Sequence, residues 1–110
     1  MTAQQADGYA AAMETISLAS YFRLKRGNCA SLAREIGISS ASLWQMASGE
    51  KRPSPQTSMR IEQATKGIVS RMDLRPHDWF EIWAELAAAN PGRAAMDRKL
   101  AEAAAGGWRR

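Results

Sequence analysis

Apolar residues recur along most of the chain at the three- and four-residue spacing of amphipathic helices, and few segments alternate as strands do. The predicted helices cover about residues 14–26, 29–36, 40–48, 55–66, 77–89 and 93–104. A glycine immediately follows each of the first four, and glycine readily takes the left-handed conformation that ends many helices. The pattern therefore predicts an all-α fold.

Residues suited to helix N-termini precede three of these segments. Asn28 is expected to cap the second predicted helix and Ser39 the third, because their side chains can accept a hydrogen bond from a free backbone N–H. Ser54 is expected to cap the fourth, with Pro55 at the first helical position. Residues 68–72, between the fourth and fifth helices, are predicted to form a short strand or an extended arm.

The most informative stretch runs from Cys29 to Ser48, where two short predicted helices are joined by a turn too tight for a separate loop. Such a turn needs a small side chain where the helices cross, which Ala33 supplies, and a residue that tolerates positive φ, which Gly37 supplies. The apolar residues expected to hold the two helices together are Leu32, Ile36, Ile38, Leu43 and Met46. This spacing is typical of a helix-turn-helix.

In a helix-turn-helix the second helix enters the major groove of DNA, and its outward N-terminal residues meet base edges. The predicted base-contact residues are Ser39, Ser40, Ala41, Trp44, Gln45 and Ser48. Gln45 can form a bidentate pair with adenine, and Ala41 can pack on a thymine methyl group. Trp44 has two equally open interpretations: a contact in the groove, or packing on the first helix or on a partner subunit.

Phosphate contacts are predicted on either side of that helix. Lys51 and Arg52 lie in the loop just beyond it, where a cation would meet the sugar-phosphate backbone, although charged loops are often only solvated. Asn28 begins the preceding helix, where free N–H groups suit an anion. The basic residues at positions 23–26 are interpreted as a solvated helix face rather than as a second DNA contact.

The charge distribution agrees with a polyanionic partner. The 110 residues carry a net charge of +4, and residues 1–75 hold 10 Lys/Arg against 6 Asp/Glu. The chain has no apolar run long enough to span a bilayer and no secretory signal at its start, so no membrane association is expected. With Cys29 as its single cysteine, the chain cannot form an intrachain disulfide, and the cytoplasm, in association with the nucleoid, is the expected location.

No catalytic arrangement is recognisable. The sequence has no Gly-rich phosphate loop, no Ser/His/Asp set and no metal-spaced cluster, so neither enzymatic activity nor a cofactor is expected. His77 cannot form a zinc site without other ligands. Glu81 and Glu85 are interpreted as residues of a solvent-exposed helix face. Cys29 is expected to be a small buried hydrophobic residue.

These motifs together resemble the Cro/lambda-repressor-like helix-turn-helix superfamily, and within it the YdaS-like group of phage and prophage regulators, which are often described as antitoxins. The matching segments are residues 32–39, 49–53, 61–67, 69–71 and 74–76. The resemblance covers about residues 16–80. Many members of the group have glycine where this chain has Lys66, although Gly67 remains available to end the helix.

The resemblance implies a lambda-repressor-like fold, and the helical spacing places about five helices in a DNA-binding domain at residues 14–89. A flexible N-terminus at 1–13 and a C-terminal helical extension and tail at 90–110 are expected from the composition and helical spacing there. The resemblance also implies a homodimeric transcriptional repressor that binds double-stranded DNA at an operator near its own gene. The antitoxin description would add a cognate toxin as partner. Two alternatives remain: a protein-interaction module of the same fold, and a DNA-binding protein without sequence preference.

Two apolar stripes are candidates for a dimer interface. The first lies on the fifth predicted helix, at Trp79, Ile82, Trp83 and Leu86, where a core role is the principal interpretation. The second lies on the last helix, at Met96 and Leu100.

Overall fold

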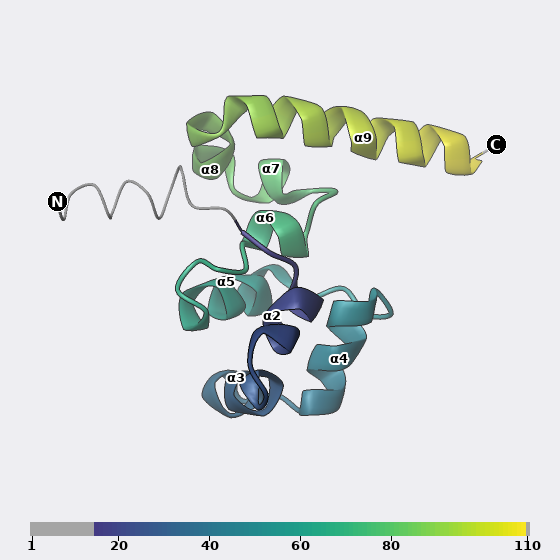
Figure 1. Cartoon of the computed structure of the whole chain (residues 1–110). Helices are drawn as coiled ribbons and strands as arrows, with labels where there is room; N and C mark the ends of the chain where they lie inside the picture. Colours follow the sequence, from purple (N-terminus) through teal and green to yellow (C-terminus); the bar gives the residue numbers. More distant parts are fainter. Residues whose placement is uncertain (1–14, 110) are drawn as a thin grey trace, which may run out of the picture. The chain divides into compact units, whose positions relative to one another are not determined.

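The computed structural model describes the backbone of residues 15–109 and the side chains as far as Ala104, and the predicted flexible segment 1–13 lies outside this part. Between residues 15 and 109 the chain forms eight helices and no strand, which confirms the predicted all-α fold (Figure 1). No helix in the described part is both long and apolar enough to cross a membrane.

The chain divides into two compact units, the first ending at Leu74 and the second beginning at Arg75. Unit 1 contains α2 (Leu18–Leu24), α3 (Asn28–Ile36), α4 (Ser40–Ser48), α5 (Pro55–Ala64) and α6 (Arg71–Leu74). Unit 2 contains α7 (Trp79–Ile82), α8 (Ala84–Ala89) and α9 (Pro91–Arg109). This division lies before α7 because α7 and α8 pack with α9. The boundary predicted from the sequence lies near residue 90.

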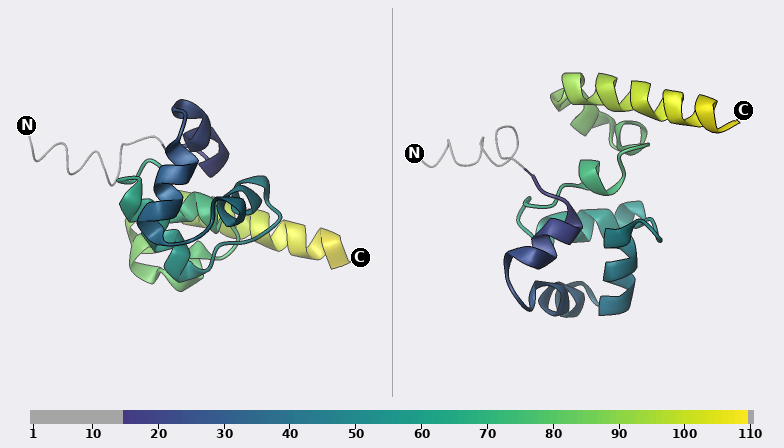
Figure 2. Two further views of the ribbon diagram at one scale, coloured as in Figure 1. Left: turned by 90° about the horizontal axis from the view of Figure 1, so that it is seen from below. Right: turned by 45° about the vertical axis from the view of Figure 1, so that its right-hand side comes forward.

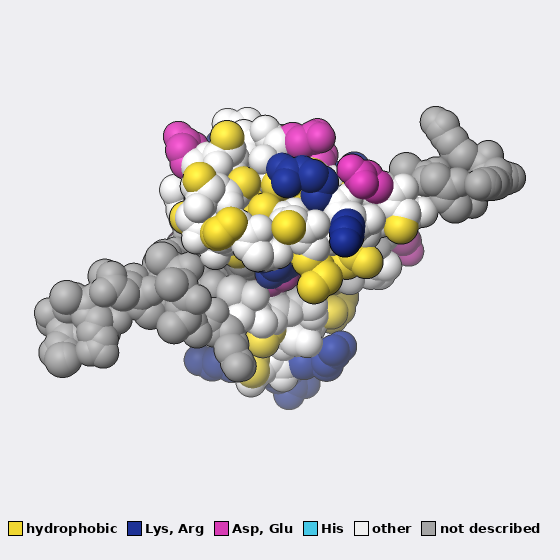
Figure 3. Space-filling view, turned by 90° about the horizontal axis from the view of Figure 1, so that it is seen from above, with side chains coloured by type: hydrophobic (Ala, Val, Ile, Leu, Met, Phe, Trp, Pro, Cys, Tyr) yellow, Lys and Arg dark blue, Asp and Glu magenta, His cyan; other side chains and the backbone are white. Residues whose placement is uncertain are grey.

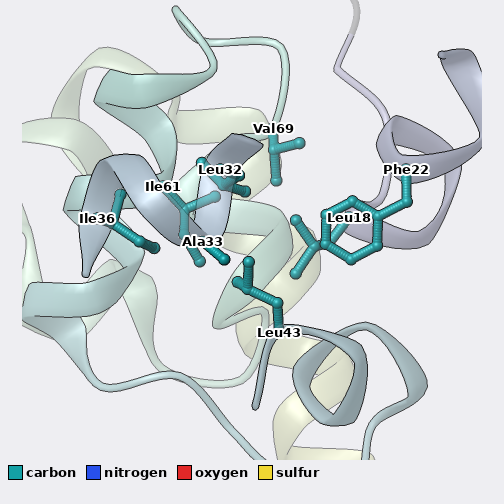
Figure 4. Packing of buried hydrophobic residues seen from close by; sticks show 8 residues of the cluster. All are labelled: Leu18, Phe22, Leu32, Ala33, Ile36, Leu43, Ile61 and Val69. Carbon is teal, nitrogen blue, oxygen red and sulfur yellow. The ribbon is translucent and has the colours of Figure 1, made fainter. Parts of the chain in front are cut away.

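The helices of unit 1 surround one hydrophobic core. α3 contacts α2, α4 and α5, and the two views in Figure 2 show these helices gathered around it. The core residues are Leu18, Phe22, Leu32, Ala33, Ile36, Leu43, Ile61 and Val69 (Figure 4). Leu43 is the only one of them contributed by α4, and it is fully buried. Burial of this side chain therefore fixes which face of α4 points outward.

Serine residues cap the N-termini of three helices in unit 1. The Ser39 hydroxyl accepts a hydrogen bond from the Ser42 N–H at 3.0 Å, and the Ser54 hydroxyl accepts one from the Thr57 N–H at 3.1 Å, as the sequence predicted. α2 begins at Leu18 behind a Ser17 cap rather than at residue 14. Ser17 is extended, and its hydroxyl accepts a hydrogen bond from the Ser20 N–H, so the helix starts after Ser17.

The prediction that Asn28 caps α3 is wrong. Gly27 occupies the cap position in a left-handed conformation with φ of 91°, and Asn28 is the first residue of the helix. The left-handed glycine turns the chain directly from α2 into α3. The Asn28 side-chain amide donates instead to the Tyr21 carbonyl at 2.8 Å, which ties the start of α3 to α2.

Residues 68–72 form neither a strand nor an extended arm. The Val69 N–H donates to the Thr65 hydroxyl at 3.2 Å, and the Thr65 hydroxyl in turn donates to the Ile61 carbonyl at 2.9 Å. The Ile68 carbonyl accepts from the Ile16 N–H at 3.0 Å, and α6 begins at Arg71. These hydrogen bonds pair backbone N–H and C=O groups within a turn, so the segment does not need hydrogen bonds to a neighbouring strand.

Lys66 adopts a left-handed conformation with φ of 56°, directly before the left-handed Gly67. We expect Lys66→Gly to stabilise unit 1 by about 1 kcal/mol, because a residue with a Cβ is strained there and glycine is not. Urea denaturation followed by circular dichroism measures this. Lys25→Gly is the matched control, since Lys25 is extended with φ of −154° and glycine should there lower the stability.

Unit 2 is organised around Trp79, which is fully buried. Its indole N–H donates to the Asp97 carboxylate at 2.8 Å, and the Arg93 guanidinium donates to the same oxygen at 2.9 Å. The Phe80 ring meets the Trp79 ring edge-on at 5.8 Å, and the Arg98 guanidinium lies 4.9 Å from its centroid. α9 therefore joins α7 through the polar network at Asp97 and through the contact of Arg98 with the Phe80 ring.

Two helix predictions for unit 2 need correction. The helix expected at 77–89 is interrupted at Trp83, whose φ of −118° and ψ of 80° are not helical, so α7 and α8 are separate. The last helix begins at Pro91 rather than at 93, because proline fits the first turn of a helix, where its missing N–H is not needed. It also runs to Arg109, beyond the predicted end at 104.

Candidate nucleic-acid interface

The turn between α3 and α4 has the geometry that the sequence predicted. Gly37 is left-handed with φ of 75°. Its N–H and that of Ile38 both donate to the Ala33 carbonyl, at 2.9 and 3.1 Å. Ser39 then begins α4. Leu32 and Ala33 of α3 and Leu43 of α4 are buried in the same core. This packing fixes the angle at which the two helices cross.

The opposite face of α4 is open to solvent. Its exposed residues include all six predicted base-contact positions: Ser39, Ser40, Ala41, Trp44, Gln45 and Ser48. Two of these hydroxyls are engaged by their own helix, since Ser39 caps it and Ser48 donates to the Gln45 carbonyl at 3.1 Å. Within the described residues, the Gln45 side-chain amide makes no hydrogen bond, so both its donor and its acceptor face solvent.

The starts of α3 and α4 lie next to each other. The Cys29 thiol is 3.8 Å from the Ser40 carbonyl, so the first turns of the two helices are in contact. Cys29 is half-buried rather than a core residue, because it sits at this contact near the surface. Helix N-termini present unpaired N–H groups and a positive dipole, so two of them side by side favour an anion over this surface.

Trp44 is partly fixed by the fold. Its ring meets the Phe22 ring of α2 edge-on, with centroids 4.8 Å apart, and the residue is still 48% exposed. Of the two interpretations left open by the sequence, packing on the first helix is therefore present in the structure. The exposed half remains accessible to a ligand on the α4 surface.

The loop after α4 folds back toward that helix. Gly49 is left-handed, and the N–H groups of Glu50 and Lys51 both donate to the Gln45 carbonyl, at 2.9 and 3.1 Å. The Lys51 ammonium group reaches Ser42 at 3.2 Å, which places its charge above α4. Arg52 is exposed one residue further on. Ser42 was not among the predicted contacts, and nothing in its spacing indicated the bond to Lys51.

Asn28 differs from the other predicted phosphate contacts. Its amide group already donates to the Tyr21 carbonyl, although it stays partly exposed in the first turn of α3. A phosphate near it would be met mainly by backbone N–H groups, and Asn28 would then act by orienting α3.

A shallow pocket of about 280 Å³ lies between α3 and α5. Its lining residues are Glu35, Ile36, Arg60, Gln63 and Ala64. None of them belongs to α4, so the pocket is not part of the surface described above. Across the described residues, no group of three or more His, Cys, Asp or Glu side chains could hold a metal ion.

The family model described as bacterial toxin YdaS matches residues 24–82, which is more than half of the chain. The chain belongs to the YdaS family. This confirms the resemblance drawn from the turn and from the segments after it. No curated protein matches the chain.

The YdaS segment contains every residue predicted to contact DNA, from Asn28 to Arg52. It ends at Ile82, the last residue of α7, so α8 and α9 lie beyond the part that defines the YdaS family. YdaS membership indicates a phage or prophage regulator or a protein related to toxin–antitoxin systems.

Proposed function

We propose that this YdaS-family protein is a sequence-specific DNA-binding transcriptional regulator, a Cro-type phage or prophage repressor that acts on an operator near its own gene. The observation that carries the proposal is the outward face of α4, whose residues other than Trp44 are small or polar, while Leu43 on its inner face is fully buried. A helix presented in this way by a helix-turn-helix suits the major groove.

In the proposed complex, α4 lies in the major groove. The free Gln45 amide pairs with the N6 and N7 atoms of an adenine, and Ala41 packs on a thymine methyl group. Ser40 offers a hydroxyl group to either strand. The adjacent first turns of α3 and α4 face a phosphate, and Lys51 and Arg52 meet the backbone on the other side.

Repression follows from occupancy rather than from catalysis. A homodimer would place two copies of α4 in successive major grooves about 34 Å apart and so exclude polymerase from the promoter. One short helix contacts few base pairs, and a second copy supplies the additional affinity and specificity. The operator is therefore expected to be an inverted repeat.

The proposal is tested in two steps. Duplexes are first selected from a random pool with the purified protein, and the affinity for the enriched duplex is then measured by fluorescence anisotropy at several salt concentrations. Recovery of an inverted repeat supports the proposal. Equal binding to all sequences, with affinity that collapses as salt rises, would identify a non-specific DNA-binding protein instead. No binding at low salt would exclude DNA as the ligand.

Gln45→Ala is expected to weaken binding to the selected operator by about 1–3 kcal/mol and to relax the preference at one base pair, because the bidentate amide contact is lost. Anisotropy on the operator and on its single-base variants measures both effects. Gln63→Ala is the matched control, since Gln63 is also exposed but lies on α5. An equal loss in the two variants would contradict a base contact by Gln45.

Arg52→Ala is expected to weaken binding to all duplexes similarly and to make the dependence of log K on log salt shallower by about 1, because one phosphate contact disappears. The measurement is a salt titration with the operator and with an unrelated duplex. Arg60→Ala serves as the control, because Arg60 is an exposed arginine on α5. An unchanged slope for Arg52→Ala would remove it from the interface.

A second candidate function is a protein-interaction module that binds a protein of a toxin–antitoxin pair. The half-exposed Trp44 ring and the description of the family as a bacterial toxin favour it. This function predicts failure to bind any duplex at all salt concentrations, together with co-purification of a stoichiometric partner. Trp44→Ala should then release the partner.

A further inference from the structure

The last helix presents large apolar side chains to solvent. On α9, Met96 is 59% exposed and Leu100, one turn later, is 60% exposed. Ala103 is exposed on the next turn of the same side. We call these three residues the α9 stripe. Exposure of Met and Leu side chains to water costs free energy, so a stripe of them along one helix favours a covering partner.

The α9 stripe is distinct from the face by which α9 packs within its own unit. Successive helix residues turn by roughly 100°, which puts Ala94, Asp97 and Ala101 on one side and the stripe on another. Ala94 and Asp97 are buried, and Asp97 holds the Trp79 indole. Among the described residues, α9 therefore packs through one face, and nothing covers the stripe.

The other candidate for a dimer interface is occupied inside the chain. Trp79 is fully buried against α9, and Phe80 is also buried beneath Arg98. Of the apolar groups on α7, Ile82 remains 37% exposed, well below the values of Met96 and Leu100. The exposed apolar surface of unit 2 is thus concentrated on α9.

We propose that the α9 stripe is covered by the α9 stripe of a second copy of this chain, with the two helices antiparallel. The proposal names the interface of the dimer proposed above and rests on that proposed function only for its biological role. It concerns residues that lie beyond the segment matched by the YdaS family model.

The order of side-chain sizes along the stripe favours an antiparallel pair. The large residues Met96 and Leu100 come first, and the small Ala103 follows. In an antiparallel pair, Met96 of each copy meets Ala103 of the other, and the two Leu100 side chains meet near the two-fold axis. A parallel pair would place large against large at one end and leave a gap at the other.

The exposed charges beside the stripe are also complementary in this orientation. Lys99 and Glu102 are exposed and carry opposite charges. Two antiparallel helices centred near Leu100 bring Lys99 of each copy close to Glu102 of the other, whereas a parallel pair aligns like with like. Asp97 and Arg98 already have partners in their own chain. Figure 3 shows apolar, basic and acidic side chains side by side on the surface of unit 2.

The expected dimer is weak and concentration-dependent. α9 has 19 residues and is therefore roughly 28 Å long, and a single pair of such helices buries less surface than a standard protein interface. Sedimentation equilibrium of the full chain, without DNA and from low micromolar to near-millimolar concentration, should show a monomer–dimer equilibrium. A monomer at every concentration would overturn the proposal.

Met96→Glu/Leu100→Glu should weaken self-association at least tenfold and leave the circular dichroism spectrum unchanged, because both side chains are mostly in solvent in the monomer. Glu85→Lys, an exposed change on α8, is the control and should leave the dimer intact. Equal self-association of the double variant and the unaltered protein would overturn the proposal.

The orientation has its own test. Lys99→Glu and Glu102→Lys should each weaken the dimer, and the two changes together should restore it. In a Cys29→Ser background, Leu100→Cys should form an intermolecular disulfide under mild oxidation, and Ala95→Cys, on another side of α9, should not. Absence of both rescue and cross-link would overturn the antiparallel pair. Because no DNA is present, failure here leaves DNA binding by a single copy untouched.

Discussion

Leu43→Ala is expected to destabilise the helix-turn-helix unit by about 2–5 kcal/mol, because the side chain is fully buried and its removal leaves a cavity between α4 and the rest of the core. This loss is a large fraction of the stability of a small domain, which lies near 5–15 kcal/mol. The core positions the outward face of α4, so DNA binding should decline together with the folded population.

Urea denaturation followed by circular dichroism measures the loss. Leu24→Ala is the matched control, because Leu24 is a leucine in the neighbouring α2 but is 64% exposed, and its truncation should change the stability by less than about 1 kcal/mol. Similar values for the two variants would mean that α4 is not held by this core. Binding to the operator under conditions where Leu43→Ala remains folded should be nearly normal.

The sequence predicted the α3–turn–α4 unit well because its determinants are local. Gly37 is required where φ is positive, Ala33 is small where the helices cross, and Leu43 is apolar where α4 faces the core. Each of these requirements acts within a few residues of the chain. The direction of α4 and its exposed residues follow from them, which is why the candidate site could be outlined before its geometry was known.

Predictions failed where a distant residue determines the local conformation. Asn28 has the chemistry of a cap, but its amide group is used by the Tyr21 carbonyl seven residues earlier. Residues 68–72 contain the β-branched Ile68 and Val69, yet the Thr65 hydroxyl and the Ile16 N–H hold them in a turn. Hydrogen bonds of this kind leave no periodic signal in the sequence.

The candidate site was predicted less fully than the fold. Packing of Trp44 on Phe22 was one of two open interpretations, and only the 4.8 Å ring contact distinguishes them. The bond from Lys51 to Ser42 joins residues nine apart across a helix end, a spacing with no fixed meaning.

Trp79→Ala is expected to destabilise unit 2 by about 3–5 kcal/mol, the usual range for a fully buried large aromatic residue. The change also takes away the indole N–H that Asp97 accepts, leaving that buried carboxylate with the Arg93 guanidinium. Trp79→Phe is the matched control, because it retains an aromatic ring and removes only the donor, so its loss should be smaller.

Amide hydrogen exchange of the Trp79→Ala protein separates the two units. Protection should fall in α7, α8 and α9 and persist in α3 and α5, because the division of the chain lies between Leu74 and Arg75. An equal fall of protection in α3 would contradict independent units and favour the longer domain predicted from the sequence. The same variant should lose self-association through α9 while a single copy still binds the operator. The paired measurements therefore relate the fold of unit 2 to dimer formation and the fold of unit 1 to DNA recognition.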